Sequence, residues 1–283
     1  MTEEQIQQEI EILAQQPLPQ KRVWEVDFVR GLLIWLVTFD HFLYDCAFLF
    51  RFTSEFGLAL KSFAVNYYLG YNLAGDVRAV IQYGCIMLFV FIAGLSCALS
   101  KSNFKRGVKM AGFSFAFTFV TYMLENLFGF VGMTITFNVL HVIATCTLMW
   151  SLIDLIFVKC NKTGKTILYS VVSIVSVVVI ILGYHYLNNI IKTPLTPFQS
   201  IFFYNSTLFA NSPGDHLNLF PALGFFMIGA MLSKVLYKER KTLFPFVNEK
   251  YLIPFTFSGK YCLFIYIGAQ IFFVALGGIL GWI

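Results

Sequence analysis

The sequence predicts an all-α membrane protein, a polytopic bundle of about seven transmembrane helices. Of its 283 residues, 58% are hydrophobic and only 12% are charged. The mean hydropathy of +0.73 is too high for a soluble chain of this length. Apolar runs long enough to cross about 30 Å of hydrocarbon recur along the chain. The segments between these runs are alternately rich and poor in lysine and arginine, as the positive-inside rule expects.

Each apolar run ends at polar or basic residues, and these ends define the predicted crossings. Only a short link, Gly129 to Met133, divides the third run from the fourth, so a merged or re-entrant arrangement stays open there. The predicted crossings lie at about residues 26–50, 80–100, 108–128, 134–158, 166–187, 217–237 and 259–282.

The basic residues predict the orientation. Those that fall on the same side as the amino terminus lie at 21–22, 101–109, 159–165 and 234–250. Those on the opposite side are Arg51, Lys61, Arg78 and Lys192. Because short cytoplasmic loops are enriched in Lys and Arg, we expect an internal amino terminus and an external carboxy terminus in the cell membrane, inner or plasma. The net charge of +5 then comes mostly from the basic residues of the predicted internal segments, and it implies no nucleic-acid partner.

Two parts of the chain are predicted. Residues 1–22 form a cytoplasmic N-terminal segment, and residues 23–283 form the transmembrane domain. In the first part Ile6, Ile10 and Leu13 recur at helical spacing, so the segment is amphipathic or flexible before Pro17 ends the pattern. It lacks an apolar h-region, so we expect no cleavable signal peptide.

The first crossing carries an unusual number of ionisable groups for a membrane segment. On a helix, Asp27, Arg30, Thr38, His41 and Asp45 fall within an arc of roughly 80° and form one polar stripe. Arg30 and His41 are about three turns, or roughly 16 Å, apart along the axis. We therefore expect the cation near the inner face and the imidazole deeper in the membrane.

These residue types suit acid–base and phosphate chemistry. His41 and Asp45, four residues apart, resemble a base and its orienting acid. Arg30 has a fork geometry that suits phosphate oxygens, and Asp27 is placed to hold it as an ion pair. On spacing alone, a polar seam between packed helices with no reaction explains the stripe equally well. The six cysteines have no metal-ligand spacing, so we expect no metal and no disulfide framework.

Other polar residues are weaker predictions. His141 shares a helix face with Asn138 and Thr145. These residues line the same cavity as the stripe, or His141 is a hydrogen-bonded interhelical histidine. Asp40 and Tyr44, which lie on either side of His41 in the sequence, are further predicted cavity or substrate residues. Tyrosines in the outward segment that follows, such as Tyr67, suit either a sugar-contacting surface or an aromatic belt.

The order of several motifs resembles a known family. The first crossing has an Asp-x-x-Arg-Gly pattern and places a histidine eleven residues after its arginine. This pattern resembles transmembrane acyltransferases, among them acyltransferase family 3. The whole chain is more similar to bacterial members of the heparan-alpha-glucosaminide N-acetyltransferase catalytic-domain family. The further stretches that carry this likeness are LFVFIAGLSCALS at 88–100, FNVLHVIA at 137–144, FPALGFFMIGAMLS at 220–233 and SGKYCLFIY at 258–266.

The resemblance implies transfer of an acetyl group from cytosolic acetyl-CoA to a sugar or glycan on the outer side, with no metal. Arg30 would then steer the CoA phosphates and His41 would activate the acceptor, directly or through an acetyl-histidine. Expected partners are the bilayer, the CoA thioester, the acceptor and a second copy of the chain. Gly259-Lys260-Tyr261 departs from the Gly-x-His-Ser of many relatives.

Two other functions remain open at this point. A small-solute or proton-coupled transporter would use the same stripe as a proton relay. A noncatalytic membrane module would bind a ligand there without turnover.

Overall fold

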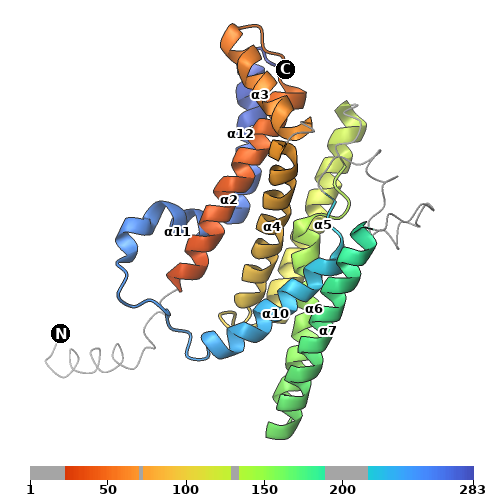
Figure 1. Ribbon diagram of the computed structural model, residues 1–283, viewed down its shortest axis with the longest axis vertical. Coiled ribbons are helices and arrows are strands. Elements are labelled where there is room, and N and C mark those ends of the chain that lie inside the picture. The colour runs from red at the N-terminus through yellow and green to blue at the C-terminus, as the bar shows by residue number, and fades with distance from the viewer. Residues whose placement is uncertain (1–22, 70–72, 129–133, 189–215) are drawn as a thin grey trace, which may run out of the picture.

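The computed structural model describes residues 23–69, 73–128, 134–188 and 216–283, and the regular structure over these residues is helical (Figure 1). The elements are α2 (Trp24–Tyr44), the π-helix η1 (Asp45–Leu49), α3 (Glu55–Leu69), α4 (Leu73–Leu95), α5 (Asn103–Phe128), α6 (Val139–Lys159), α7 (Lys162–Asn188), α10 (Leu219–Leu236), the 3₁₀ helix η2 (Glu249–Leu252), α11 (Ile253–Lys260) and α12 (Cys262–Ile279).

Seven of the described helices are long and apolar enough to cross a membrane, which confirms the predicted bundle. The third and fourth crossings are separate helices, α5 and α6. The link between them and the predicted amphipathic segment at 1–22 lie outside the described residues. In Figure 1 the first residues of α2 and the carboxy terminus lie toward opposite ends of the bundle, and the orientation of those ends stays a prediction.

Three element boundaries differ from the predictions. The outward segment between the first and second predicted crossings contains a helix, α3. Helix α4 begins at Leu73 and so includes Arg78, which we had placed in a loop, because the guanidinium pairs with a carboxylate of α2. The last crossing begins at Cys262 as α12, and the short helix α11 precedes it, because the backbone of Tyr261 between them is not helical (φ −110°, ψ 23°).

Glycines set two of the closest helix crossings. A Cβ added at Gly94 of α4 would overlap the carbonyl oxygen of Phe226, and one added at Gly229 of α10 would overlap that of Phe91. In the same way, Gly31 of α2 and Gly259 of α11 each lie against the partner helix's backbone. Small residues let helices in lipid approach closely, and the van der Waals contacts formed there favour their association.

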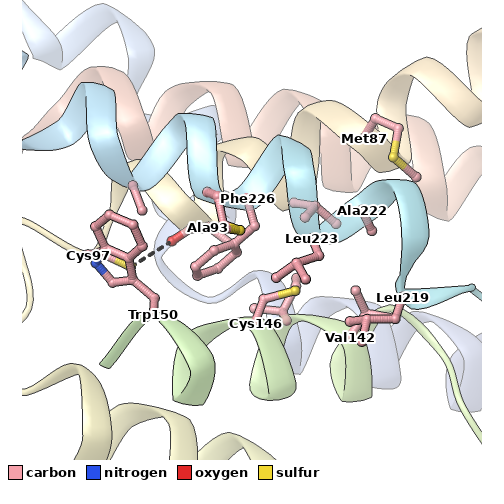
Figure 2. Packing of buried hydrophobic residues seen from close by; sticks show 14 of the residues in the cluster. Met87, Ala93, Cys97, Val142, Cys146, Trp150, Leu219, Ala222, Leu223 and Phe226 are labelled. Carbon is pink, nitrogen blue, oxygen red and sulfur yellow. Dashed lines mark hydrogen bonds between the residues drawn. The ribbon is translucent and has the colours of Figure 1, made fainter. Parts of the chain in front are cut away.

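The main core lies between α4, α6, α7 and α10. Figure 2 shows Trp150 and Cys146 of α6 packed against Phe226 and Leu223 of α10. Half of the α6 span and 56% of the α10 span are buried, against 6% of the α12 span. Helices α6 and α10 are therefore central to the bundle, and α12 is peripheral.

Candidate functional site

Helix α2 packs against α11, α12, α4 and α3, and its polar stripe lies on this packed side. Asp27 and Asp45 are buried, and the other three stripe residues are partly buried. On the opposite side of the helix, Leu32 and Leu36 are 39% and 44% exposed. Exposed apolar side chains suit contact with lipid, so the polar residues of α2 lie on the side that packs against protein.

Arg30 is held by two side chains. Its Nη1 lies 3.3 Å from Oδ1 of Asp27, which forms the predicted ion pair. Its Nη2 donates a short hydrogen bond to Oγ of Ser96, in the junction after α4. The Ser96 hydroxyl donates its own proton to the carbonyl of Ile92 at 2.7 Å, so its oxygen is free to accept from Arg30. Two motif stretches far apart in the sequence therefore meet at this guanidinium.

The closing motif also acts on α2. Gly259 crosses α2 next to Gly31, and the indole Nε1 of Trp35 donates to Oγ of Ser258 at 2.9 Å. The Ser258 hydroxyl in turn donates to the carbonyl of Pro254 at 2.7 Å. Arg30 is thus placed at the junction of α2, α4 and α11 by residues from three of the motif stretches.

His41 lies farther along α2 and makes few contacts. Its ring packs edge-on against Tyr266 of α12, with centroids 5.5 Å apart. Among the described residues, neither of its ring nitrogens has a hydrogen-bond partner. A partly buried imidazole with unbonded nitrogens is available to bind or deprotonate a ligand.

Asp45 lies one turn beyond His41 and is not hydrogen-bonded to it. The backbone changes from an α- to a π-helix at Asp45, and the N–H of Phe50 donates to its carbonyl at 2.8 Å. One carboxylate oxygen of Asp45 is buried without a partner in the described part of the chain. A single π turn of this kind is frequent at functional sites. The N–H of Asp45 still bonds to the carbonyl of His41, so the π turn shifts the register of the residues after Asp45 and leaves Asp45 one α-helical turn from His41.

The other two residues predicted around His41 face α3 and α4. Asp40 accepts two N–H groups of Arg78, at 3.2 and 3.1 Å. Tyr44 packs against Phe48 and Tyr68, with ring centroids 4.9 and 5.6 Å apart. The sequence reasoning missed Arg78 as a residue of this region. The signal that could have found it was Asp40, an acidic residue in an apolar run that needs a basic partner.

His141 and Asn138 form a hydrogen-bonded unit at the start of α6. The N–H of Leu140 donates to Oδ1 of Asn138 at 3.1 Å, and the N–H of Asn138 donates to Nδ1 of His141 at 3.4 Å. Nε2 of His141 lies 3.0 Å from Oγ1 of Thr118 on α5. His141 is only 5% exposed, and Asn138 is fully buried. This geometry matches the interhelical alternative, in which the histidine joins two helices.

A second set of charges lies at the opposite end of α4, α5, α6 and α10. Lys234 forms a short ion pair with Asp154, and Nη2 of Arg106 donates to the carbonyl of Ala93 at 3.0 Å. Arg106 comes from the basic segment 101–109, so part of that segment is used to join helices.

A small apolar hollow lies between α2 and α12. Its volume is about 240 Å³, and Thr38 is the stripe residue that lines it. Neither Arg30 nor His41 is among its lining residues, which are Trp35, Thr38, Phe39, Phe42 and Phe273. The residues that the structure describes hold no group of three or more His, Cys, Asp or Glu side chains suited to a metal.

Comparison with known families identifies the chain. The family described as heparan-alpha-glucosaminide N-acetyltransferase, catalytic, matches residues 22–271. The chain belongs to this family. This membership indicates a membrane acetyltransferase, and all of the stretches on which the resemblance rested fall within the match. The relation to acyltransferase family 3 stays a prediction. No curated protein and no solved structure matched the chain.

Proposed function

We propose that the protein transfers an acetyl group from acetyl-CoA, bound on the cytosolic side, to a sugar on the opposite side of the membrane. The observation that carries this proposal is the pair of functional groups on one face of α2. Helix α2 presents a guanidinium fixed by two neighbours and, about three turns later, an imidazole without hydrogen bonds in the described structure.

Arg30 is assigned to the donor. A guanidinium binds phosphate oxygens through a planar fork of N–H groups. Asp27 and Ser96 hold this fork before any ligand arrives, so less side-chain entropy is lost on binding. Arg30 also lies on the half of α2 that the basic residues assign to the cytosol. It would hold the phosphates of CoA at that end.

His41 is assigned to the proton transfer. The acceptor's amino or hydroxyl group attacks the thioester carbonyl while His41 takes its proton, the C–S bond breaks, and the imidazolium returns the proton to the sulfur of CoA. The buried carboxylate of Asp45, one turn away, favours the positive charge that develops on the ring. In this proposal Asp45 acts through its charge, because no hydrogen bond joins it to His41.

The family name supplies the first acceptor to test. Its printed substrate is an alpha-glucosaminide, so the amino group of a terminal glucosamine is the acceptor that we propose. The family match favours transfer over the transporter alternative, which uses the same stripe but forms no acetylated product.

The test uses purified protein in liposomes, with acetyl-labelled CoA and methyl α-glucosaminide. We expect labelled product from the wild type. His41→Ala should lose at least a hundredfold in rate, whereas Arg30→Ala should mainly raise the KM for acetyl-CoA. Arg51→Ala removes an exposed arginine beyond the end of the same helix and serves as the matched control. Wild-type rates in both site variants would refute the assignment, and solute uptake without product would support the transporter.

A further inference from the structure

An ion pair between α2 and α4 lies beside His41 and has no part in the reaction described above. Oδ1 and Oδ2 of Asp40 accept from Nε and Nη2 of Arg78 at 3.2 and 3.1 Å. The two side chains are 21% and 14% exposed, so the pair is only partly accessible. Because this side-on pairing engages Nε and Nη2, the N–H groups of Nη1 point away from Asp40.

Tyr68 of α3 completes this group. The guanidinium carbon of Arg78 lies 3.7 Å from the centre of the Tyr68 ring, and the Tyr68 hydroxyl donates to the carbonyl of Asp40 at 2.6 Å. Burial, followed by the nearby Asp40 carboxylate, raises the pKa of Tyr68, so its hydroxyl stays protonated and keeps donating. We call Asp40, Arg78 and Tyr68 the α2–α4 polar cluster.

The charge of the cluster limits what it can bind. Its carboxylate and guanidinium neutralise one another, so a multiply charged phosphate gains little there. Placing an ion pair in a membrane protein is costly, and such pairs usually mark a functional path. A carboxylate that accepts, a guanidinium that donates and adjacent aromatic rings together suit the hydroxyl groups and apolar face of a sugar.

We propose that the α2–α4 polar cluster binds the acceptor sugar. This inference rests on the proposed function. Asp40 and His41 are successive residues of α2, so a sugar bound to the Asp40 carboxylate is held at the level of His41 along the helix axis, and it must extend around α2 from the α4 side to reach the imidazole. Tyr44 adds an exposed ring within contact distance of Tyr68, with centroids 5.6 Å apart.

The position of the cluster along α2 separates the two substrates. Asp40 follows Arg30 by ten residues, or about 15 Å along the helix. The donor's phosphates and the acceptor are then held at opposite ends of α2, with His41 near the acceptor. In Figure 1 the junction of α2, α3 and α4 lies toward the same end of the bundle as the carboxy terminus, the end that the basic residues assign to the outside.

The first test separates the KM values of the two substrates. Arg78→Gln should raise the KM for methyl α-glucosaminide about tenfold or more, because a charged hydrogen bond is lost. The KM for acetyl-CoA should change by less than about twofold. Arg78→Lys keeps the charge but loses the planar fork, so its acceptor KM should be intermediate. Arg51→Gln is the control. An unchanged acceptor KM in Arg78→Gln would overturn the proposal.

A charge swap distinguishes binding from helix bracing. The double variant Asp40→Arg with Arg78→Asp re-forms an ion pair between α2 and α4 but exchanges the positions of donor and acceptor groups. We expect the double variant to have a higher Tm than either single variant, while its KM for methyl α-glucosaminide stays well above that of the wild type. If the swap restores both stability and the acceptor KM, the pair only braces the helices and the proposal fails.

A binding measurement keeps this inference separate from the reaction. Methyl α-glucosaminide should raise the Tm of the wild type and of His41→Ala, but not that of Arg78→Gln. If the sugar stabilises the protein in this pattern while no acetyl product forms, the proposed function fails and the sugar site stands. If product forms but Arg78→Gln binds sugar as the wild type does, the sugar site fails alone.

Discussion

Two of the histidines in membrane helices, His41 and His141, have opposite surroundings. His141 is buried, belongs to the hydrogen-bonded cap of its own helix and contacts Thr118 of the next one. His41 is partly exposed, has one ring contact and has no hydrogen bond within the described structure. Both residues were predicted to line a cavity or carry chemistry, and the residue type alone did not separate them.

The difference shows what distinguishes a structural imidazole from an available one. At His141 the helix cap and Thr118 already use both ring nitrogens, so a ligand would have to displace them. At His41 the neighbouring carboxylates do not bond the ring: Asp40 pairs with Arg78 of α4, and one carboxylate oxygen of Asp45 has no partner among the described residues. The surrounding bonds, which depend on tertiary packing, decide which histidine is free to react.

The largest effect should appear when the alanine variants of the two histidines are compared. We expect His41→Ala to lower the rate per folded molecule by roughly 10² to 10⁴, the usual contribution of a general base. His141→Ala should keep most of its rate per folded molecule but lose about 1–3 kcal/mol of stability, because buried partners are left unbonded. Acetyl transfer and thermal unfolding, measured on the same preparations, check both parts. A large rate loss in His141→Ala with an unchanged Tm would reverse the comparison.

The next test moves the helix that carries His41. Gly31→Ala places a methyl group against the backbone of Phe255, so α11 must shift away from α2. We expect a loss of roughly 1–3 kcal/mol in stability, typical of overpacking, together with reduced transfer. Gly112→Ala is the matched control, since an added Cβ there meets nothing within 4 Å. Equal Tm values for the two variants would show that the close crossing does not hold α2.

The sequence predicted the bundle well because hydropathy is a local property. Each of the seven spans is a run of apolar residues that needs no knowledge of its neighbours. The boundary errors occur where distant residues intervene. Arg78 seemed to end a crossing, but Asp40, 38 positions earlier, lets it remain within α4.

The candidate site was predictable only in part. Helical spacing placed the polar stripe on the packed side of α2, and it found the Asp27–Arg30 pair. It could not find Ser96, which reaches Arg30 from 66 residues away, or Thr118, which engages His141. Spacing also placed Asp45 one helical turn from His41, in agreement with the bond between the Asp45 N–H and the His41 carbonyl. The π turn that follows has no clear signal in the sequence.

The smallest effect should come from Ser96, which fixes Arg30 without contacting the reacting atoms. Ser96→Ala removes one hydrogen bond to a charged group, so we expect the KM for acetyl-CoA to rise about 5- to 30-fold, equivalent to about 1–2 kcal/mol. Ser176→Ala is the control, because that buried serine also bonds the carbonyl four residues earlier but touches no arginine. The kcat of Ser96→Ala should stay near the wild-type value, because His41 is unaffected. If Ser96→Ala lowers kcat and leaves the KM unchanged, Arg30 acts in the transition state and the division of labour along α2 must be redrawn.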